Sequence, residues 1–423
     1  MQGNALSTIL VIIVLLAADY YILRGLQTAF RKKQFPFSKW FTGLYWVGSV
    51  LLIAGLVISI YADIGVGLRG AIFLLFFLVL IFKVFYLVFI AVDDIRRLIT
   101  LQIRKRKNKE SSAPQPKLND IPRSEFLMKA GILAGVVPLY LLKHNMSKGI
   151  YDYRVENVTL YLPNLPKAFD GMRIGQISDI HAGSFHSVHN MQGGVELLMR
   201  QKADVIFFTG DLVNGQTAEV ERVLKVFQQV KAPMGVYSIL GNHDYGDYGK
   251  WPTPAAKAKN LNDMYQAHKT LGWDLLIDEH RRLKVNGEEI GVLGIGNWGE
   301  MSRFPKYGKM EKAVQGTDDL PVKLLLSHDP SHWRAEVIPK YPQIDMMFSG
   351  HTHGMQFGVR TDDFQWSPIQ YVYSEWAGLY REKHQQIYVN VGYGFLGYPG
   401  RIGILPEITI FELKAAADAS YKA

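Results

Sequence analysis

The stretch Gly175-Gln176-Ile177-Ser178-Asp179-Ile180-His181 decides the fold of the larger part of this chain. It is an apolar run, typical of a strand, that ends in a carboxylate and an imidazole two residues apart. Because side chains alternate along a strand, Asp179 and His181 are predicted to point to the same side. One oxygen and one nitrogen at this spacing can hold a metal ion. By itself, the pair would more often be a polar loop after a strand.

Four later stretches have the same form, in which a short apolar run leads into metal-ligating side chains. They are Gly210-Asp211 after Phe207–Thr209, Gly241-Asn242-His243-Asp244 after Ser238–Leu240, Ser327-His328-Asp329 after Leu324–Leu326, and Gly350-His351-Thr352-His353 after Met346–Ser349. Ligands at the carboxyl ends of buried strands are typical of the active site of an open α/β sheet. The glycines before Asp211, Asn242 and His351 allow sharp turns close to a metal.

The predicted ligands are too many for one ion and favour two ions that share a bridging ligand. They are two carboxylates, one amide oxygen and four imidazoles: Asp179, Asp211, Asn242, His181, His328, His351 and His353. A mixture of oxygen and nitrogen suits manganese, iron or zinc better than magnesium or calcium. The chain has no cysteine, which excludes thiolate ligands and disulfides. Two metals about 3.5–4 Å apart stabilise both oxygens in a phosphoryl displacement.

In this order, the five motifs resemble those of the calcineurin-like metallophosphoesterases, over roughly residues 155–415. Within that family the chain is most similar to the membrane-associated phosphodiesterases of the YkuE/YaeI type. The resemblance implies an α/β (α+β) fold, a four-layer αββα sandwich, here in residues 151–423. Gly354-Met355-Gln356 departs from the usual Gly-Gly-Gln after the last histidine, and this leaves substrate preference open.

The resemblance also implies a role for each site residue. Asp179, His181 and His353 would hold one metal, Asn242, His328 and His351 the other, and Asp211 would bridge them. His243 would contact the phosphate and protonate or stabilise the leaving oxygen, and Asp244 would orient His243. Attack on phosphorus would come in line from a metal-bridging hydroxide.

Alternating short apolar runs and glycine-bearing loops from about residue 153 predict an α/β or α+β domain. The predicted strands are 155–162, 173–178, 204–209, 235–240, 290–295, 322–327, 344–349, 388–391 and 407–413, and the predicted helices are 188–201 and 217–230. Residues 250–270 are expected to be either a helical cap beside the site or a solvated surface helix. Arg401 either meets a phosphate oxygen in a pocket near Gly392–Gly394 or is a plain surface arginine. The aromatic-rich stretch 371–380 is expected to be internal packing or a membrane-proximal surface.

Before this domain, residues 1–92 contain three apolar stretches, 6–23, 41–61 and 71–92, each long enough for a transmembrane helix. Asp19 and Lys83 lie within them and are either functional, snorkelling or paired with each other. Residues 93–125 are predicted to be a basic cytoplasmic linker. Residues 126–150, with Lys129 and Pro138, are predicted to be a fourth membrane helix or an interfacial helix.

The net charge of +9 lies in two loops of this membrane region. Residues 24–39 carry five Lys/Arg and no acid, and residues 93–125 carry nine Lys/Arg against five acids, whereas the remainder is balanced. The globular domain is therefore not expected to bind nucleic acid. Because positive loops stay inside, both should be cytoplasmic, and the domain should be extracytoplasmic if 126–142 crosses the membrane.

The sequence thus predicts an integral protein of a bacterial inner or cell membrane that acts as a dinuclear metal-dependent phosphoesterase. Its expected partners are the lipid bilayer and a phosphodiester, phosphomonoester or pyrophosphate of a lipid or cell-envelope compound. One alternative is a cytoplasmic-face hydrolase of a nucleotide-linked lipid such as UDP-diacylglucosamine. Another is a degenerate esterase domain that serves as a membrane sensor or scaffold. The metal, the substrate and the oligomeric state stay open at this point.

Overall fold

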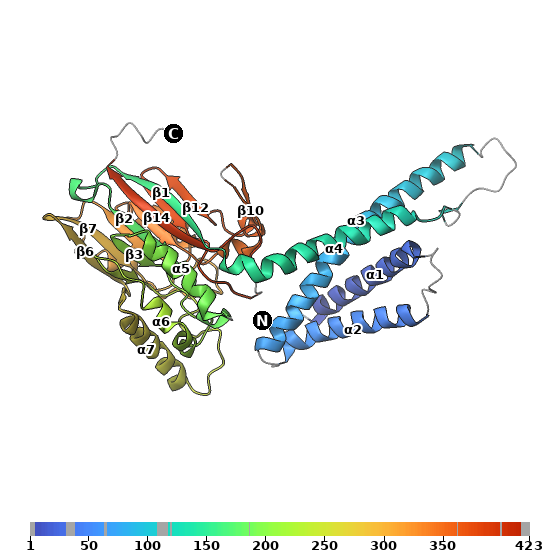
Figure 1. Cartoon of the computed structure of the whole chain (residues 1–423), viewed down its shortest axis with the longest axis horizontal. Coiled ribbons are helices and arrows are strands. Elements are labelled where there is room, and N and C mark those ends of the chain that lie inside the picture. The colour runs from blue at the N-terminus through green and yellow to red at the C-terminus, as the bar shows by residue number, and fades with distance from the viewer. Residues whose placement is uncertain are drawn as a thin grey trace. The chain divides into compact units, whose positions relative to one another are not determined.

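The computed structural model describes residues 5–30, 39–62, 66–107, 117–118, 121–185, 187–361, 363–397 and 400–415. The chain forms two compact units, residues 1–144 and 145–423. Figure 1 shows a helical unit at the amino-terminal side and a unit of two stacked sheets flanked by helices.

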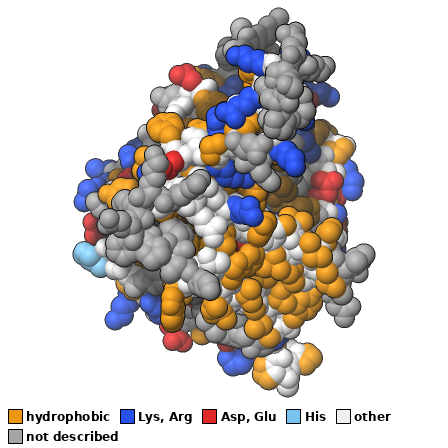
Figure 2. Space-filling model, turned by 90° about the vertical axis from the view of Figure 1, so that its right-hand side faces the viewer, with side chains coloured by type: hydrophobic (Ala, Val, Ile, Leu, Met, Phe, Trp, Pro, Cys, Tyr) orange, Lys and Arg blue, Asp and Glu red, His pale blue; other side chains and the backbone are white. Residues whose placement is uncertain are grey.

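The helical unit contains α1 (Ala5–Ala29), α2 (Lys39–Tyr61), α3 (Val66–Lys107) and most of α4 (Glu125–Lys148). Within α1, α2 and α3, the segments Thr8–Ala29, Trp40–Ser59 and Leu75–Lys107 are long and apolar enough to cross a membrane. They coincide with the three predicted spans. Many of their apolar side chains are exposed, as expected for contact with hydrocarbon. Figure 2 shows a broad area of hydrophobic side chains with lysine and arginine side chains near its border.

The third helix is longer than predicted, because it continues through the basic run and ends at Lys107. The predicted linker 93–125 therefore begins as helix. Residues 108–116 and 119–120 of that linker lie outside the part of the chain that the structure describes.

A polar cluster joins α1, α2 and α3 inside the apolar unit. Asp19 is fully buried, and Lys83 Nζ lies 2.7 Å from Asp19 Oδ1. The hydroxyl of Tyr45 donates to the same carboxylate at 2.7 Å, and Ser49 donates to its second oxygen. Of the alternatives for Asp19 and Lys83, the structure shows the mutual pair.

The helix α4 runs antiparallel along α3. Ser124 N donates to Asp93 Oδ1 at 3.1 Å, near the start of α4. One turn after another, Gly131 then faces Tyr86 and Gly135 faces Phe82, so closely that a Cβ would come within 2.7 and 2.6 Å of these rings. As residue numbers rise along α4, the residues that they contact on α3 have falling numbers, which shows that the two helices are antiparallel.

The second unit is built on two six-stranded sheets. The first has the order β1 (Arg154–Leu162), β14 (Glu407–Ala415), β2 (Arg173–Ile177), β3 (Val205–Phe208), β4 (Val236–Ser238), β5 (Asp274–Leu275). The second has the order β12 (Gly378–Glu382), β13 (Gln385–Val389), β9 (Met346–Ser349), β8 (Lys323–Leu326), β7 (Glu288–Gly294), β6 (Glu279–Val285). Strands β2 to β5 are parallel neighbours, as are β7, β8, β9 and β13. A small hairpin pairs β10 (Val359–Arg360) with β11 (Gln365–Trp366).

Three apolar cores separate four layers. Side chains of both sheets, such as Phe207 and Phe348, form the middle core. On its outer face the first sheet packs against α5 (Val188–Arg200), α6 (Leu224–Phe227) and α7 (Pro254–Leu271). The second sheet packs against α8 (Met310–Ala313), the π-helical turn η7 (Trp333–Val337) and α9 (Ile338–Lys340). The predicted αββα sandwich behind a transmembrane region is confirmed.

Most predicted strands agree with observed ones to within a few residues. The predicted helix 217–230 is instead two short pieces, the 3-10 helix η6 (Thr217–Arg222) and α6. Strands β5, β6 and β10 to β12 were not predicted from the pattern, since they are short or polar.

Candidate metal centre

The predicted ligands lie in the turns directly after five strands, where the two sheets meet. Asp179 and His181 follow β2, Asp211 follows β3, Asn242 and His243 follow β4, His328 follows β8, and His351 and His353 follow β9. Because the parallel strands of each sheet end at the same edge, both sheets deliver their ligands to one place.

Asp179, His181 and His353 form one group of possible metal ligands. His181 Nε2 lies 3.0 Å from His353 Nε2, and His353 Nε2 lies 3.2 Å from Asp179 Oδ1. All three side chains are buried.

Asp211, His328 and His351 form the second group. His328 Nε2 lies 3.2 Å from Asp211 Oδ2, and His351 Nδ1 lies 3.3 Å from His328 Nε2. The amide oxygen of Asn242 lies 2.8 Å from the same His351 Nδ1. The structure thus brings together all seven residues predicted as ligands.

Asp211 lies between the two groups. Its Oδ2 is 3.2 Å from His328 Nε2 and 3.6 Å from His181 Nε2, so one carboxylate oxygen is close to an imidazole of each group. This is the position that a bridging ligand requires.

The backbone at the ligands is unusual. Five of them have left-handed φ angles, listed here: Asp179 52°, His181 50°, Asp211 60°, His351 73° and His353 51°. Such conformations cost about 1–3 kcal/mol each in non-glycine residues and cluster at functional sites. Asp179 and His181 therefore converge through a strained turn beyond β2, and not through strand alternation as predicted.

Two glycines permit this packing. A Cβ at Gly241 would collide with the carboxylate of Asp211, and a Cβ at Gly350 would collide with that of Asp179. Both positions precede a predicted ligand, as expected, and it is close approach to a carboxylate that requires glycine there.

Hydrogen bonds outside the cluster fix the imidazole rings. His328 Nδ1 donates to the carbonyl of Thr209 at 2.7 Å, which leaves Nε2 as the ligand atom. His351 uses Nε2 with the hydroxyl of Tyr373 at 2.8 Å, which leaves Nδ1. His243 Nδ1 donates to the carbonyl of Asn214 at 2.7 Å, and its ring lies 5.0 Å from that of His181.

Burial and the neighbouring charges shift the pKa values of the side chains in the cluster in opposite directions. Burial lowers the pKa of His181 to about 3, so its ring is neutral. Burial alone would lower the pKa of His328, but the carboxylates of Asp211 and Asp179 outweigh it and raise that pKa to about 10. Burial would raise the pKa of Asp211, yet the neighbouring imidazoles hold it well below its ordinary value. The pKa of Asp179 is lowered as well, so both carboxylates are ionised and attract a cation.

The residues fit two metal ions. Two buried carboxylates face four imidazoles, and His181 Nδ1 is a buried nitrogen without a hydrogen-bond partner. Nε2 atoms of His181 and His353 lie 3.0 Å apart, where two lone pairs repel unless a cation or proton lies between them. The donors are a mixture of nitrogen and oxygen, a set that suits manganese, iron or zinc better than magnesium or calcium.

The predicted contact between Asp244 and His243 is not what the structure shows. Asp244 is fully buried, and its carboxylate accepts from the backbone amides of Asp211, Leu212, Val213 and Gly241. The carbonyl of Asn214 orients His243 instead. Burial and the charge of Asp211 raise the pKa of Asp244 to about 7.

Arg401 fits neither of its two predictions. It is fully buried, and its guanidinium donates to the carbonyls of Gly394 at 2.6 Å and Val391 at 2.8 Å. Nη2 also lies 3.3 Å from His353 Nδ1. These bonds hold the loop behind His353, so Arg401 supports the metal cluster and is not a surface side chain.

Four residues at the rim of the cluster were not found from the sequence. Tyr248 contacts Asn242 Nδ2 through its hydroxyl at 2.9 Å, and Tyr373 contacts His351. The ring of Phe304 lies 4.6 Å from that of His351, and the exposed Arg303 packs over Phe304. Lone aromatic residues in loops carry no motif, and Arg303 had no signal. Tyr248 and Phe304 were hinted at by the aromatics gathered in 245–251 and 298–307. Tyr373 lies in the aromatic-rich stretch 371–380, where internal packing was one of the two expectations, and its side chain is buried beside His351.

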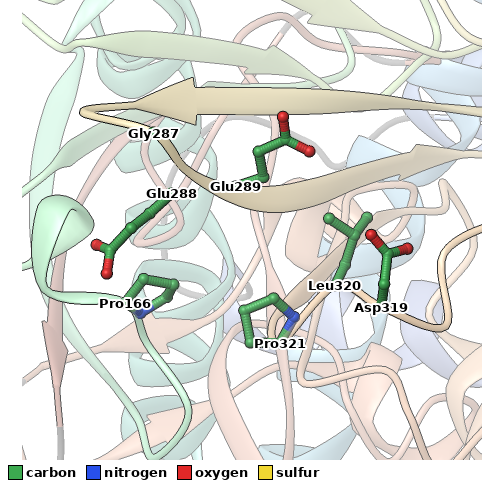
Figure 3. A pocket seen from close by; sticks show the side chains of 7 residues that line it. All are labelled: Pro166, Gly287, Glu288, Glu289, Asp319, Leu320 and Pro321. Carbon is green, nitrogen blue, oxygen red and sulfur yellow. The ribbon is translucent and has the colours of Figure 1, made fainter.

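A hollow of about 350 Å³ lies elsewhere on the unit, under the turn between β6 and β7 (Figure 3). Its carboxylates are already engaged: Glu288 accepts from Ala168 N at 2.7 Å, and Asp319 pairs with Arg282 at 2.7 Å. It therefore adds no ligands to the metal centre. Its lining residues are Pro166, Gly287, Glu288, Glu289, Asp319, Leu320 and Pro321.

Comparison with known families matches both parts of the chain. Residues 172–355 match the family described as "Calcineurin-like phosphoesterase". Residues 5–150 match the family described as "Probable Calcineurin-like phosphoesterase, transmembrane domain".

Comparison with individual proteins gives distant relatives of the same kind. A zebrafish (Danio rerio) "Transmembrane protein with metallophosphoesterase domain" is 28% identical over 293 residues, covering 67% of this chain but only 63% of the relative. The "Uncharacterized metallophosphoesterase YkuE" of Bacillus subtilis is 29% identical over 254 residues, covering 59% of this chain and 82% of the relative. Among solved structures, the NAD nucleotidase of Haemophilus influenzae has a TM-score of 0.37 and 16% identity, covering 53% of this chain and 45% of that one.

Proposed function

Since this chain belongs to the calcineurin-like metallophosphoesterases and carries their transmembrane domain, we propose that it is a phosphoester hydrolase that cleaves phosphate esters of a lipid or cell-envelope compound. The bond cut is that of a phosphodiester, phosphomonoester or pyrophosphate. The observation that supports this best is the pair of adjoining ligand groups, which suits two ions on either side of one carboxylate.

In this proposal, Asp179, His181 and His353 hold one ion, Asn242, His328 and His351 hold the other, and Asp211 bridges. Two ions of manganese, iron or zinc held there would supply an activated water and neutralise charge on the phosphate. The protein itself holds these ligands in fixed orientations before any substrate arrives.

His243 is the proposed proton donor to the leaving oxygen. Its Nδ1–H is held by the carbonyl of Asn214, and its ring is only half-buried beside His181, so Nε2 is free to act towards a substrate. General acids of this kind typically contribute about 10²–10⁴-fold. Tyr248, Phe304 and Arg303 at the rim are the side chains placed to contact the rest of the substrate.

The proposed location is the outer face of a bacterial cell membrane. Among the described helices, α4 is not one of the three that are long and apolar enough to cross a membrane. The antiparallel contacts of Gly131 and Gly135 with the middle of α3 nevertheless support a fourth crossing, because an interfacial helix would not follow α3 into the apolar layer. With both basic loops inside, that crossing exports the catalytic unit. If α4 does not cross, the unit is cytoplasmic, and a nucleotide-linked lipid such as UDP-diacylglucosamine becomes the better substrate. Alkaline phosphatase and green fluorescent protein fused to the carboxyl terminus distinguish the two: export gives active phosphatase and dark fluorescent protein.

The hydrolase proposal is tested on the purified full chain. Two ions per chain are expected by elemental analysis. Hydrolysis of bis(p-nitrophenyl) phosphate should disappear after chelation and return with manganese, zinc or iron. A membrane scaffold with a degenerate site would bind fewer ions and would hydrolyse no ester under any of these conditions.

A further inference from the structure

Exposed apolar side chains on the catalytic unit are concentrated in one segment. Of the nine large hydrophobic residues that are exposed in the described part of this unit, five lie between residues 355 and 372. These five, which we call the 355–372 surface, are Met355, Val359, Phe364, Tyr371 and Val372. Tyr371 is 78% exposed and Phe364 58% exposed, whereas the other four, Tyr161, Val188, Tyr248 and Tyr307, are scattered over separate elements. Concentrated apolar surface of this kind marks an interaction site.

This surface begins at the metal centre. Met355 follows the ligand His353 by two residues, in the 3-10 turn η8 (His353–Gln356). The rest is carried by the β10–β11 hairpin and by η9 (Pro368–Tyr371). Ser367, just before η9, donates to the carbonyl of Gly354 at 2.8 Å, which fixes that turn against the metal-bearing loop.

The surface also lies beside the point where the chain enters the unit from α4. Ile402 pairs with the segment before β10, since Gly358 N donates to Ile402 O and Ile402 N donates to Gln356 O, both at 2.9 Å. The preceding residue, Arg401, is in contact with Gly149, the first residue after α4, where a Cβ would come within 2.5 Å of the Arg401 carbonyl oxygen. The Arg401 guanidinium reaches His353 at 3.3 Å. Arg401 thus contacts both Gly149, where the chain enters the unit, and the ligand His353, and the next residue, Ile402, pairs with the segment before β10.

We propose that the 355–372 surface docks on the bilayer that holds α1 to α4, and that the metal centre therefore acts on phosphate esters in the head groups of membrane lipids. The inference rests on the proposed hydrolase function and names its substrate class. Only residues 149–153, which include η3 (Gly149–Tyr151), separate α4 from β1, so the tether keeps the unit within reach of the membrane at a high effective concentration. Exposed tyrosine and phenylalanine suit the interface between head groups and hydrocarbon.

The docking is apolar and does not depend on anionic lipid. The residue beside Phe364 is the exposed acid Asp363, whose negative charge would repel anionic head groups.

In the reaction, a water oxygen forms a bond to phosphorus, the bond from phosphorus to the leaving oxygen breaks, and that oxygen takes a proton. One product keeps the lipid tails and stays in the bilayer, and the other product is either phosphate or the released head group.

The docking is tested with single-cysteine labelling, for which the cysteine-free chain gives a clean background. Tyr371→Cys and the matched control Tyr161→Cys, on β1, are labelled with an environment-sensitive fluorophore in the full chain in phosphatidylcholine nanodiscs. Nitroxide-bearing lipids should quench the label at 371 and not at 161. Quenching should persist at about 0.5 M salt, where surface charge is largely screened. If the emission of the label at 371 reports an apolar environment but nitroxide-bearing lipids do not quench it, the position is covered by protein, and the docking proposal is wrong. Equal quenching at 371 and 161 would also contradict the proposal.

The substrate class is tested in the same nanodiscs. Phosphatidic acid and phosphatidylglycerol should be cleaved about tenfold or more faster than the soluble esters glycerol phosphate and glycerophosphoglycerol at equal bulk phosphate. The double variant Phe364→Ser/Tyr371→Ser should lose this advantage while it cleaves bis(p-nitrophenyl) phosphate within about twofold of the wild-type rate. Cleavage of the nitrophenyl ester without any preference for the lipids overturns the lipid inference alone. Loss of nitrophenyl ester cleavage by the wild-type chain with metals restored would instead contradict the hydrolase proposal.

Discussion

Replacing Asp244 by Asn removes a buried acceptor that serves four backbone amides. Oδ1 accepts from Leu212 N at 2.8 Å and Val213 N at 3.2 Å, and Oδ2 accepts from Asp211 N and Gly241 N, both at 2.9 Å. Asparagine has one oxygen and one amino group in these positions. Whichever way the amide is turned, two of the four backbone donors lose their acceptor and face another donor.

The expected cost follows from this count. An unsatisfied buried donor costs about 1–3 kcal/mol, so two of them cost about 2–6 kcal/mol. Part of this is offset, because burial and the charge of Asp211 raise the pKa of Asp244 to about 7. The raised pKa means that the ionised carboxylate destabilises the fold as pH rises through this value, and asparagine relieves that effect above about pH 7. A net loss of about 3 kcal/mol corresponds to a drop of about 6–12 °C in the unfolding temperature for a unit of this size.

The assay is thermal unfolding of the full chain in detergent, followed by tryptophan fluorescence with a chelator present, so that metal binding adds nothing to the stability. Metal content is measured separately in its absence and should fall, since Asp211 N is one of the four donors. Asp263→Asn, in an exposed ion pair with Lys259, is the control and should change little. If Asp244→Asn keeps its unfolding temperature and its metals but turns over slowly, the carboxylate acts on His243 and the reasoning is refuted.

Three further changes test the site and the membrane unit. Asp211→Asn should empty both metal positions, whereas Asp179→Asn should leave the second partly occupied; full metal content by elemental analysis in Asp211→Asn would rule out the bridge. His243→Ala should bind both ions but turn over about 10²–10⁴-fold more slowly, with a smaller loss for nitrophenyl than for alkyl esters; equal losses for both would count against a proton donor. Asp19→Asn should lower the unfolding temperature of the full chain more than the double variant Asp19→Asn/Lys83→Met, because an unpaired buried lysine costs about 3–5 kcal/mol; the reverse order would show that the ion pair is not what holds these helices.

The ligands could be predicted from the sequence because each belongs to a short pattern, an apolar run followed by a metal-ligating side chain. The prediction for Asp179 and His181 was nevertheless wrong in one respect. Strand alternation was expected to align them, but β2 ends at Ile177 and both residues are left-handed. Their convergence depends on hydrogen bonds such as that from His351 N to Asp179 at 3.0 Å, which join residues far apart in the sequence.

The roles of Asp244 and Arg401 could not be predicted correctly for the same reason. A carboxylate next to a histidine and an arginine in a glycine-rich loop look equally available to substrate when only neighbours in sequence are known. Their roles depend on backbone groups of other loops. The amides of loop 211–213 donate to Asp244, and the carbonyls of loop 391–394 accept from Arg401. Likewise, apolar composition located the third membrane span but not the end of α3, because leucine, arginine, lysine and glutamine beyond residue 92 are good helix formers whether or not a bilayer surrounds them.

The metal centre depends on both sheets, because bonds that hold it run from one sheet to the other. His328, at the end of β8, is oriented by the carbonyl of Thr209 after β3, at 2.7 Å. Gln176 of β2 donates to Ser349 O of β9 at 3.0 Å, and His351 N donates to Asp179 at 3.0 Å. Each bond has one end on a strained ligand or within two residues of one, and such strain persists only where the surroundings over-determine the backbone. The packing of the two sheets around Phe207 and Phe348 is therefore a condition for the site, since neither sheet carries a complete ligand set.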